Sequence, residues 1–474
     1  MPDRLTSIDA SFLYMEHSTT VMHVGSVMVF QPPVAGFEYD RLLTLVEGRI
    51  AQVPRYRQRI RVVPGHLANP VWVDDADFDI GYHVRRAALP RPGTDAQLEE
   101  FVARTQPRPL DRTRPLWEVY LVEGLVGGRF AIVTKSHHAL VDGFNALDIA
   151  QVLVRAQAGY DEEVGDPRDP RSEPSDLQLI GGAVLDAVRA PGQVLEAVRG
   201  GLSDVQQVGA RVLNGVGSLV SALARGAARP APTSPLNADV GRSRRFVMVG
   251  TDLEDYRAVR SRLARGPYAE DVSVNDVVLA TIAGAFRAWL LTRGEAVHSG
   301  TVVRAMVPVS VDPGDGSSAL GNRLTACFVD LPVGEPGASM RLHQIAFSMR
   351  QQMEGGQAIG ADRLVRLAGF APPTLHALGA RLGSAMSRHL FNVIITNVPG
   401  PQSSLFAGDA QMLSTYPVIP LATGQALAIG LTSYDGGVYF GLNADRVAMP
   451  DVDVLGQSIV DALAELAEGR DTGR

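Results

Sequence analysis

The sequence predicts an α/β protein made of two halves that are joined by a helical connector. Three observations support this fold class. The chain has 474 residues, strand-like and helix-like segments alternate on both sides of its middle, and proline-rich linkers enclose an apolar stretch between them. A chain of this length exceeds what one hydrophobic core usually supports, so two domains are expected. We place the halves at residues 1–165 and 236–474, and the linker and connector at residues 166–235.

The first half mixes strands and helices. Residues 24–30 and 129–135 are rich in β-branched and aromatic side chains, which predicts strands. Residues 39–53 carry apolar side chains at helical spacing and precede a proline, which predicts a helix. A further helix is expected to begin near Gly143, with Asp142 as its N-terminal cap.

The connector has a different composition. Residues 165–174 contain three prolines and predict an exposed linker. Between residues 177 and 228, apolar side chains recur every three or four positions, which is typical of amphipathic helices. Two interpretations stay open: helices that pack on the body of the protein, or an apolar face that lies on lipid. Residues 230–235 form a second proline-rich linker.

The second half repeats the alternation. Helices are predicted at residues 253–263, after Ser273 with Asn275 and Asp276 in the first turn, and at residues 451–466. Strands are predicted at residues 246–249, 301–308, 325–331, 391–396, 427–432 and 438–442. The last two strands flank Asp435-Gly436, whose turn chemistry predicts a hairpin.

Composition limits the class of function. Apolar residues make up 46% of the chain and charged residues 20%, as in a folded globular protein. The net charge of −7 gives no reason to expect nucleic-acid binding. Cys327 is the only cysteine, which excludes an internal disulfide and a CxxC metal site, and its strand-like surroundings predict a buried thiol.

The N-terminal residues carry no signal for export. Asp3, Asp9 and Glu16 lie within the first 20 residues, where no apolar run is present. The two most apolar stretches, residues 272–291 and 416–431, are interrupted by polar residues or proline, so no membrane span is expected. We expect a cytoplasmic protein; peripheral contact with the inner face of the plasma membrane or with lipid droplets stays open, as does the oligomeric state.

The motif HHxxxDG, formed by His137, His138, Asp142 and Gly143, follows the strand-like run at residues 129–135. A hydroxyl attacks a thioester slowly unless a base removes its proton, and histidine is mostly neutral at cellular pH. Two neighbouring residues at a strand end point to opposite sides, so only one imidazole is expected to reach a reacting centre. Asp142 would cap a helix or pair with an arginine, and Gly143 permits a positive φ.

Other chemistries are less well supported. A histidine pair is often structural, and histidine and aspartate also bind metals, but zinc usually takes three or four protein ligands and no HExxH or second His/Cys cluster is present. The sequence also lacks GxSxG, Walker A and GxGxxG motifs. General-base acyl transfer without a metal or a covalent nucleophile is therefore favoured.

An ordered set of short segments along nearly the whole chain carries a family resemblance. The segments are residues 5–13, 22–25, 115–117, 137–143, 235–237, 275–276, 304–310, 320–323 and 396–401. With them the chain resembles the bacterial wax ester synthase/acyl-CoA:diacylglycerol acyltransferase family, especially the actinobacterial triacylglycerol synthases. HHxxxDG alone is shared by a wider superfamily, so the ordered set is the more specific signal.

The resemblance implies two chloramphenicol-acetyltransferase-like halves with an active-site tunnel between them. It also implies that His138 is the general base, that His137 and Asp142 support it, and that Arg304 is a candidate partner of Asp142. Pro115, Leu116 and Trp117 would shape the acyl channel, and Asn275 and Asp276 would order the opposite wall. A packed tryptophan and a capped helix start are equally good interpretations of the last two motifs. No cofactor is implied, since acyl-CoA is a co-substrate.

The expected function is transfer of a long-chain acyl group from acyl-CoA to diacylglycerol, and also to fatty alcohols. Two alternatives stay open: an acyltransferase for another hydroxyl acceptor, such as a polyketide or glycolipid, and a catalytically silent lipid-binding homologue. Hydrolysis by water is a minor further alternative.

Overall fold

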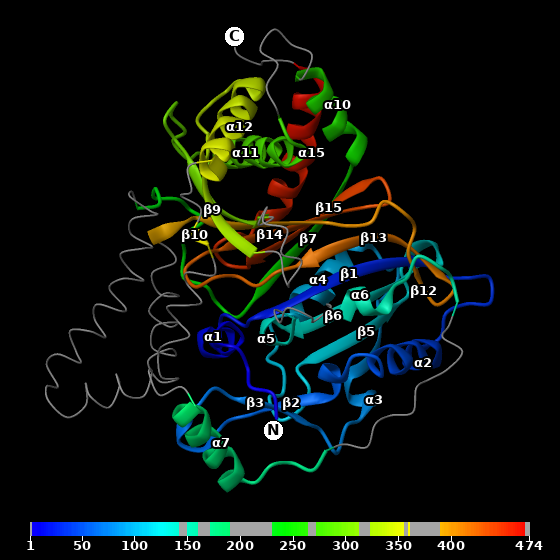
Figure 1. Cartoon of the computed structure of the whole chain (residues 1–474). Coiled ribbons are helices and arrows are strands. Elements are labelled where there is room, and N and C mark those ends of the chain that lie inside the picture. The colour runs from blue at the N-terminus through cyan, green and yellow to red at the C-terminus, as the bar shows by residue number, and fades with distance from the viewer. Residues whose placement is uncertain are drawn as a thin grey trace, which may run out of the picture.

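The computed structural model describes residues 2–141, 149–159, 171–189, 230–263, 272–311, 323–354, 359–360 and 389–469. Within these ranges the chain forms a six-stranded sheet, a seven-stranded sheet and a two-stranded hairpin, with helices packed against them (Figure 1). Both large sheets combine parallel and antiparallel pairs. The predicted α/β class, with mixed sheets in both halves, is confirmed.

The N-terminal sheet has the strand order β12-β13-β1-β6-β5-β4. Its strands are β1 (His23–Gln31), β4 (Val84–Ala88), β5 (Trp117–Glu123), β6 (Phe130–His137), β12 (Phe406–Ala407) and β13 (Ala410–Val418). Every residue of β6 is buried. Strand β6 pairs antiparallel with β1 on one side and with β5 on the other, so its end is held from both sides.

The C-terminal sheet has the strand order β10-β9-β8-β11-β14-β15-β7. Its strands are β7 (Arg244–Asp252), β8 (Val303–Val311), β9 (Arg323–Leu331), β10 (Ile359–Gly360), β11 (Val393–Pro399), β14 (Leu427–Tyr434) and β15 (Gly437–Asp445). Strands β14 and β15 form the predicted hairpin. Asp435 has φ 44° and Gly436 has φ 84°, the left-handed conformations that this turn requires.

The helices cover the sheets unequally. On the C-terminal sheet, α10, α11, α12 and α15 gather on one face (Figure 1). Among the described residues, no helix of the N-terminal half or the connector exceeds the 14 residues of α7, whereas α11, α12 and α15 have 17 to 19 residues. The bounds are α1 (Ser7–Met15), α2 (Tyr39–Ile50), α3 (Ile80–His83), α4 (Asp95–Thr105), α5 (His138–Val141), α6 (Ile149–Leu153), α7 (Asp176–Arg189), α10 (Leu253–Leu263), α11 (Val274–Thr292), α12 (Ala338–Glu354) and α15 (Val452–Glu468).

Helix α11 is the one helix of the described residues that is long and apolar enough to cross a membrane. Within its most apolar window of 18 residues, 72% of the residues are buried inside the protein. It packs against α12 and α15 and belongs to the main hydrophobic core of the C-terminal half. Its apolar character is therefore accounted for by its place in this core.

A strand from the second half of the chain completes the first sheet. Strand β13 pairs antiparallel with β1, with Gly25 opposite Val418, and also packs against β14 and β15. Gly441 permits this contact, because a Cβ at that position would lie 1.9 Å from the carbonyl oxygen of Pro417. The C-terminal half of the chain thus supplies a strand of the N-terminal sheet. The sequence pattern did not indicate this pairing. The domain boundaries at residues 165 and 236 stay predictions.

Most predicted elements are present, with ends that differ by a few residues. The helix predicted over residues 39–53 ends at Ile50, before the 3₁₀ turn that begins at Pro54. Cys327 is fully buried in β9, as expected. The predicted helix start at Asp142 and Gly143 lies outside the described residues, as does the connector beyond residue 189.

The described part of the connector packs on the body of the protein. Helix α7 buries Leu179 and Ala183 against the hairpin of β2 (Gln58–Arg61) and β3 (Val71–Asp74). On its other side Leu177 is exposed. One face of this helix therefore packs on the body of the protein. That an apolar face of the connector lies on lipid stays a prediction.

Candidate active site

The two motif histidines occupy the end of β6, where the chain passes from the central strand into the short helix α5. The backbone N–H of His137 donates to the carbonyl of Leu116, at a distance of 2.9 Å. The backbone N–H of His138 donates in the opposite direction to the carbonyl of Met22, at 2.8 Å. Both residues are therefore fixed by the segments that lead into the neighbouring strands β5 and β1.

The two imidazoles have different surroundings. His137 is 1% exposed, and its Nδ1 accepts a hydrogen bond from the backbone N–H of Ala139 at 3.0 Å. The ring of His138 is half-buried and stacks on the ring of Phe12 from α1, with centroids 4.0 Å apart and planes 11° apart. The two rings thus lie in different environments, and that only one of them reaches a reacting centre stays a prediction.

A carboxylate that sequence reasoning missed faces His137. Glu16, at the C-terminal cap of α1, places Oε2 3.5 Å from Nε2 of His137 and Oε1 3.4 Å from Nε2 of His23. Arg112 forms an ion pair with the same carboxylate from the more exposed side. Glu16, His23, Arg112 and His137 form what we call the Glu16 cluster.

Burial and hydrogen bonding act on these groups in opposite directions. Burial raises the pKa of the Glu16 carboxyl, but the contacts with His137, His23 and Arg112 outweigh it and hold this pKa well below its usual range. Burial lowers the pKa of His137 to about 4, and Glu16 counteracts this only in part. At neutral pH His137 is therefore neutral and Glu16 is ionised.

The segment Pro115-Leu116-Trp117 lies directly beside the histidine pair along β5. Besides the carbonyl of Leu116, it contributes Trp117, which is fully buried and donates from Nε1 to the carbonyl of Tyr56 at 2.8 Å. The Trp117 ring also stacks on His83, with centroids 4.6 Å apart. This motif therefore contacts the histidine pair through a backbone hydrogen bond, from His137 to Leu116. Its role in an acyl channel stays a prediction.

Asn275 and Asp276 start helix α11, as expected. Asp276 forms a reciprocal capping box with Ser273, in which the Ser273 N–H donates to Oδ2 of Asp276 at 2.8 Å. Asn275 accepts a hydrogen bond from Nδ2 of Asn397 at 3.0 Å, which connects this motif to the end of β11. Asp276 is thus a helix cap, and the ordering of a tunnel wall by this pair stays a prediction.

Two predicted site residues, Asp142 and Gly143, lie outside the described residues. The proposed partner Arg304 makes a bidentate ion pair with Asp330, at 2.6 and 3.1 Å, within the C-terminal sheet. Among the residues that the structure describes, no group of three or more His, Cys, Asp and Glu could hold a metal ion.

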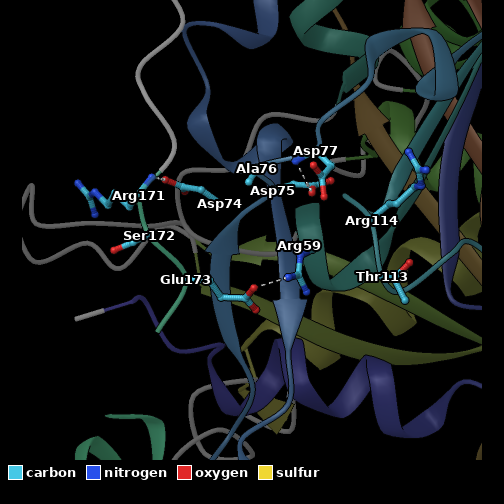
Figure 2. A pocket seen from close by; sticks show the side chains of 10 residues that line it. All are labelled: Arg59, Asp74, Asp75, Ala76, Asp77, Thr113, Arg114, Arg171, Ser172 and Glu173. Carbon is cyan, nitrogen blue, oxygen red and sulfur yellow. Dashed lines mark hydrogen bonds and ion pairs between the residues drawn. The ribbon is translucent and has the colours of Figure 1, made fainter. Parts of the chain in front are cut away.

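A surface cleft of about 450 Å³ lies between the β2–β3 hairpin and residues 171–173 (Figure 2). Arg59 pairs with Glu173 across it at 2.8 Å, and the backbone N–H of Arg171 donates to Asp74 at 2.9 Å. Its lining combines Arg59, Arg114 and Arg171 with Asp74, Asp75, Asp77 and Glu173. This mixed charge does not favour a polyanion such as CoA, and the ion pair attaches the start of the connector to the hairpin.

Comparison with known proteins decides the family. The model of the wax ester synthase/diacylglycerol acyltransferase catalytic domain matches residues 5–278, and the model of the C-terminal domain of the same family matches residues 320–467. The chain belongs to the wax ester synthase/diacylglycerol acyltransferase family. The resemblance found in the sequence is thereby confirmed, and as a member of this family the chain is an acyltransferase.

Relatives within the family cover almost the whole chain. A probable diacylglycerol O-acyltransferase of Mycobacterium tuberculosis, tgs2, is 34% identical over 98% of this chain and 99% of its own length. A second one, tgs1, is 32% identical over 98% of this chain and 96% of its own length. A third one, tgs3, is 46% identical over 55% of this chain and 97% of its own length.

Solved structures agree with this membership. The wax ester synthase/diacylglycerol acyltransferase from Marinobacter aquaeolei is 28% identical, covers 98% of each chain and superposes with a TM-score of 0.69. The first condensation domain of the CDA synthetase is 18% identical, with a TM-score of 0.54 over 98% of this chain and 96% of that chain. The latter likeness extends to the fold alone.

Proposed function

We propose that this protein transfers a long-chain fatty acyl group from acyl-CoA to the free hydroxyl of diacylglycerol, with His138 as the general base. Fatty alcohols are proposed as further acceptors. The observation that carries the proposal is the placement of His138. Its backbone is fixed at the end of the central strand, while its imidazole is half-buried rather than enclosed.

The contacts of the two histidines support the choice of His138 over His137. Nδ1 of His137 already accepts a hydrogen bond from Ala139, and its Nε2 faces Glu16. His137 therefore has no basic nitrogen left for a substrate hydroxyl, and burial further disfavours its charged form. His138 has the more open position that a general base needs in order to reach its substrate.

The proposed reaction needs two substrates and no cofactor. The hydroxyl oxygen of the acceptor bonds to the thioester carbonyl carbon while His138 takes the hydroxyl proton. The tetrahedral intermediate then expels the CoA thiolate as the C–S bond breaks, and His138 returns the proton to the thiolate. The ester and free CoA are the only products.

The proposed acceptor follows from the names of the relatives, which are called diacylglycerol O-acyltransferases. Diacylglycerol and fatty alcohols dissolve in membranes and lipid droplets rather than in water. We therefore place the protein in the cytoplasm, in peripheral contact with a lipid surface where it meets its acceptor.

Product analysis tests this function. The purified full chain is given palmitoyl-CoA with dipalmitoylglycerol or hexadecanol in parallel, and lipid products and released CoA are quantified. We expect triacylglycerol, with wax ester as a second product, and no ester from His138→Ala. Acyl transfer only to water-soluble hydroxyl acceptors, or none at all, would contradict the proposal.

A further inference from the structure

Glu16 joins two buried imidazoles from the end of a helix. Its side chain is 11% exposed and lies between Nε2 of His23 and Nε2 of His137. The side chains of both histidines are 1% exposed. The backbone N–H of Glu16 donates to the carbonyl of Phe12 at 3.2 Å, which fixes the carboxylate to the last turn of α1. A carboxylate that extends from this anchored backbone can impose an orientation on the rings that it contacts.

The hydrogen bonds of His137 determine where its proton lies. The backbone N–H of Ala139 can only donate, so Nδ1 of His137 is an acceptor and carries no proton. The proton of the neutral ring is therefore on Nε2, which faces Oε2 of Glu16. Glu16 thus favours one tautomer and one ring orientation of His137.

His23 is arranged in the opposite sense. Its Nδ1 lies 3.0 Å from the carbonyl of Gln106, which can only accept, so Nδ1 carries a proton. In the neutral ring, Nε2 would then present a lone pair to Oε1 of Glu16. A glutamine at position 16 would donate from its amide to this lone pair and would still accept from His137 through its oxygen.

The Glu16 cluster is mechanically connected to His138. The bond from Ala139 to His137 spans the first turn of α5, and His138 begins that turn. Four residues before Glu16 on α1, Phe12 stacks on the His138 ring. Residues four apart lie on the same face of a helix, so one face of α1 contacts both motif histidines.

We infer that Glu16 is a positioning residue for acyl transfer: by holding His137 in one tautomer and orientation, it keeps the His138 imidazole in place. The inference rests on the proposed role of His138. On this inference Glu16 acts through the placement of its two oxygens beside the imidazoles and not through its negative charge. A misplacement of a reacting group by about 1 Å can lower a rate about 100-fold, so an effect on kcat is expected.

Three substitutions separate geometry from charge. Glu16→Ala removes the contacts with both imidazoles and with Arg112. Glu16→Gln keeps the two imidazole contacts but loses the charge that pairs with Arg112, and Glu16→Asp keeps the charge but withdraws the oxygens by one methylene. Glu118→Gln is the matched control, because Glu118 is a similarly buried glutamate, 8% exposed against 11%, that pairs with Arg85 and Lys135. Initial rates are measured with palmitoyl-CoA and dipalmitoylglycerol, and the folded fraction is measured by circular dichroism.

We expect kcat per folded molecule to fall about 10- to 100-fold in Glu16→Ala, with KM for palmitoyl-CoA within about twofold. Glu16→Gln should stay within about threefold of the wild-type kcat and exceed Glu16→Asp. The control should keep kcat within about twofold while it loses stability. A purely structural role of Glu16 would instead lower the folded fraction and leave kcat per folded molecule unchanged.

Specific results would overturn the inference. One is a kcat per folded molecule of Glu16→Ala that equals the wild-type value. Another is a kcat of Glu16→Gln that is no higher than that of Glu16→Asp. If Glu16→Ala does not fold, the order of the Gln and Asp variants decides the question alone. A His138→Ala variant that is as active as the wild type would overturn the proposed function itself, and it is distinguishable because it leaves Glu16 intact.

Discussion

The two sheets differ in what their central strands bury. At the end of β6 in the N-terminal sheet, Lys135 and His137 are almost fully buried, and His23 lies beside them on β1. The central strands β11 and β14 of the C-terminal sheet bury aliphatic side chains, such as Ile395 and Ile429, in the main apolar core.

This difference separates two tasks: the N-terminal sheet holds the histidine pair, and the C-terminal sheet contributes to the largest apolar core of the described residues. Removing ionisable groups from water costs free energy unless they are paired, so a strand end that carries them is a costly way to build a core. The N-terminal sheet accepts this cost where it holds the histidine pair. The C-terminal sheet lies against the largest apolar core of the described residues, and the same half of the chain supplies strand β13 to the N-terminal sheet.

The largest effect on stability is expected from the C-terminal core. Trp289 is fully buried in α11 and donates from Nε1 to Asp451 at 3.0 Å. Trp289→Ala should lower the free energy of unfolding by about 3–5 kcal/mol and keep kcat per folded molecule within about twofold. Urea unfolding followed by circular dichroism, together with the acyl transfer assay, measures both. A large loss of kcat in the folded variant would contradict the division of tasks.

A substitution in the N-terminal sheet should affect stability and rate together. A Cβ on Gly25 would lie 2.0 Å from the carbonyl oxygen of Thr134, so Gly25→Ala must push β1 away from β6. We expect a loss of about 1–3 kcal/mol in the free energy of unfolding. The rate should fall as well, because the segment before β1 supplies the Met22 carbonyl that holds His138. Unchanged kcat in the folded variant would show that this backbone contact is dispensable.

The smallest effect concerns the contact between the halves and depends on pH. Glu99 of α4 accepts a hydrogen bond from the backbone N–H of Met248 in β7 at 2.7 Å, and burial raises the pKa of this carboxyl to about 7. The folded state therefore keeps a proton that the unfolded state releases near pH 4.5. The stability that this proton confers is present below pH 4.5 and is lost as the pH rises through about 7.

Glu99→Gln cannot ionise and keeps the bond to Met248. After allowance for partial exposure, the variant should be more stable than the wild type by roughly 1–2 kcal/mol at about pH 8 and nearly equal to it at about pH 4.5. Urea midpoints at the two pH values measure the difference. An equal difference at both values would mean that Glu99 does not titrate in this window.

Local patterns predicted the parts of the molecule whose causes are local. The hairpin around Asp435 and Gly436 follows from its turn residues, and the start of α11 follows from Ser273 and Asp276. The different surroundings of the two histidines arise where β6 ends at His137 and α5 begins at His138. Each of these features depends on residues that lie within a few positions of one another.

The missed features all join distant parts of the chain. The pairing of β13 with β1 brings Val418 beside Gly25, and no periodicity in either segment specifies that partner. The Glu16 cluster likewise joins positions 16, 23, 112 and 137. His23 lies within the segment 22–25 of the family resemblance and Glu16 lies three residues after the segment 5–13, but only the fold shows that both of them face His137.

A paired measurement on the two histidines tests whether His138 is the general base and His137 its support. His138→Ala and His137→Ala are compared for kcat with palmitoyl-CoA and dipalmitoylglycerol and for the free energy of unfolding. His138→Ala should lose about 100- to 10,000-fold in kcat with little change in stability. His137→Ala removes the acceptor of the Ala139 N–H and one of the three partners of Glu16, so it should lose about 2 kcal/mol in stability and less in kcat. A greater loss of kcat in His137→Ala than in His138→Ala would contradict the account.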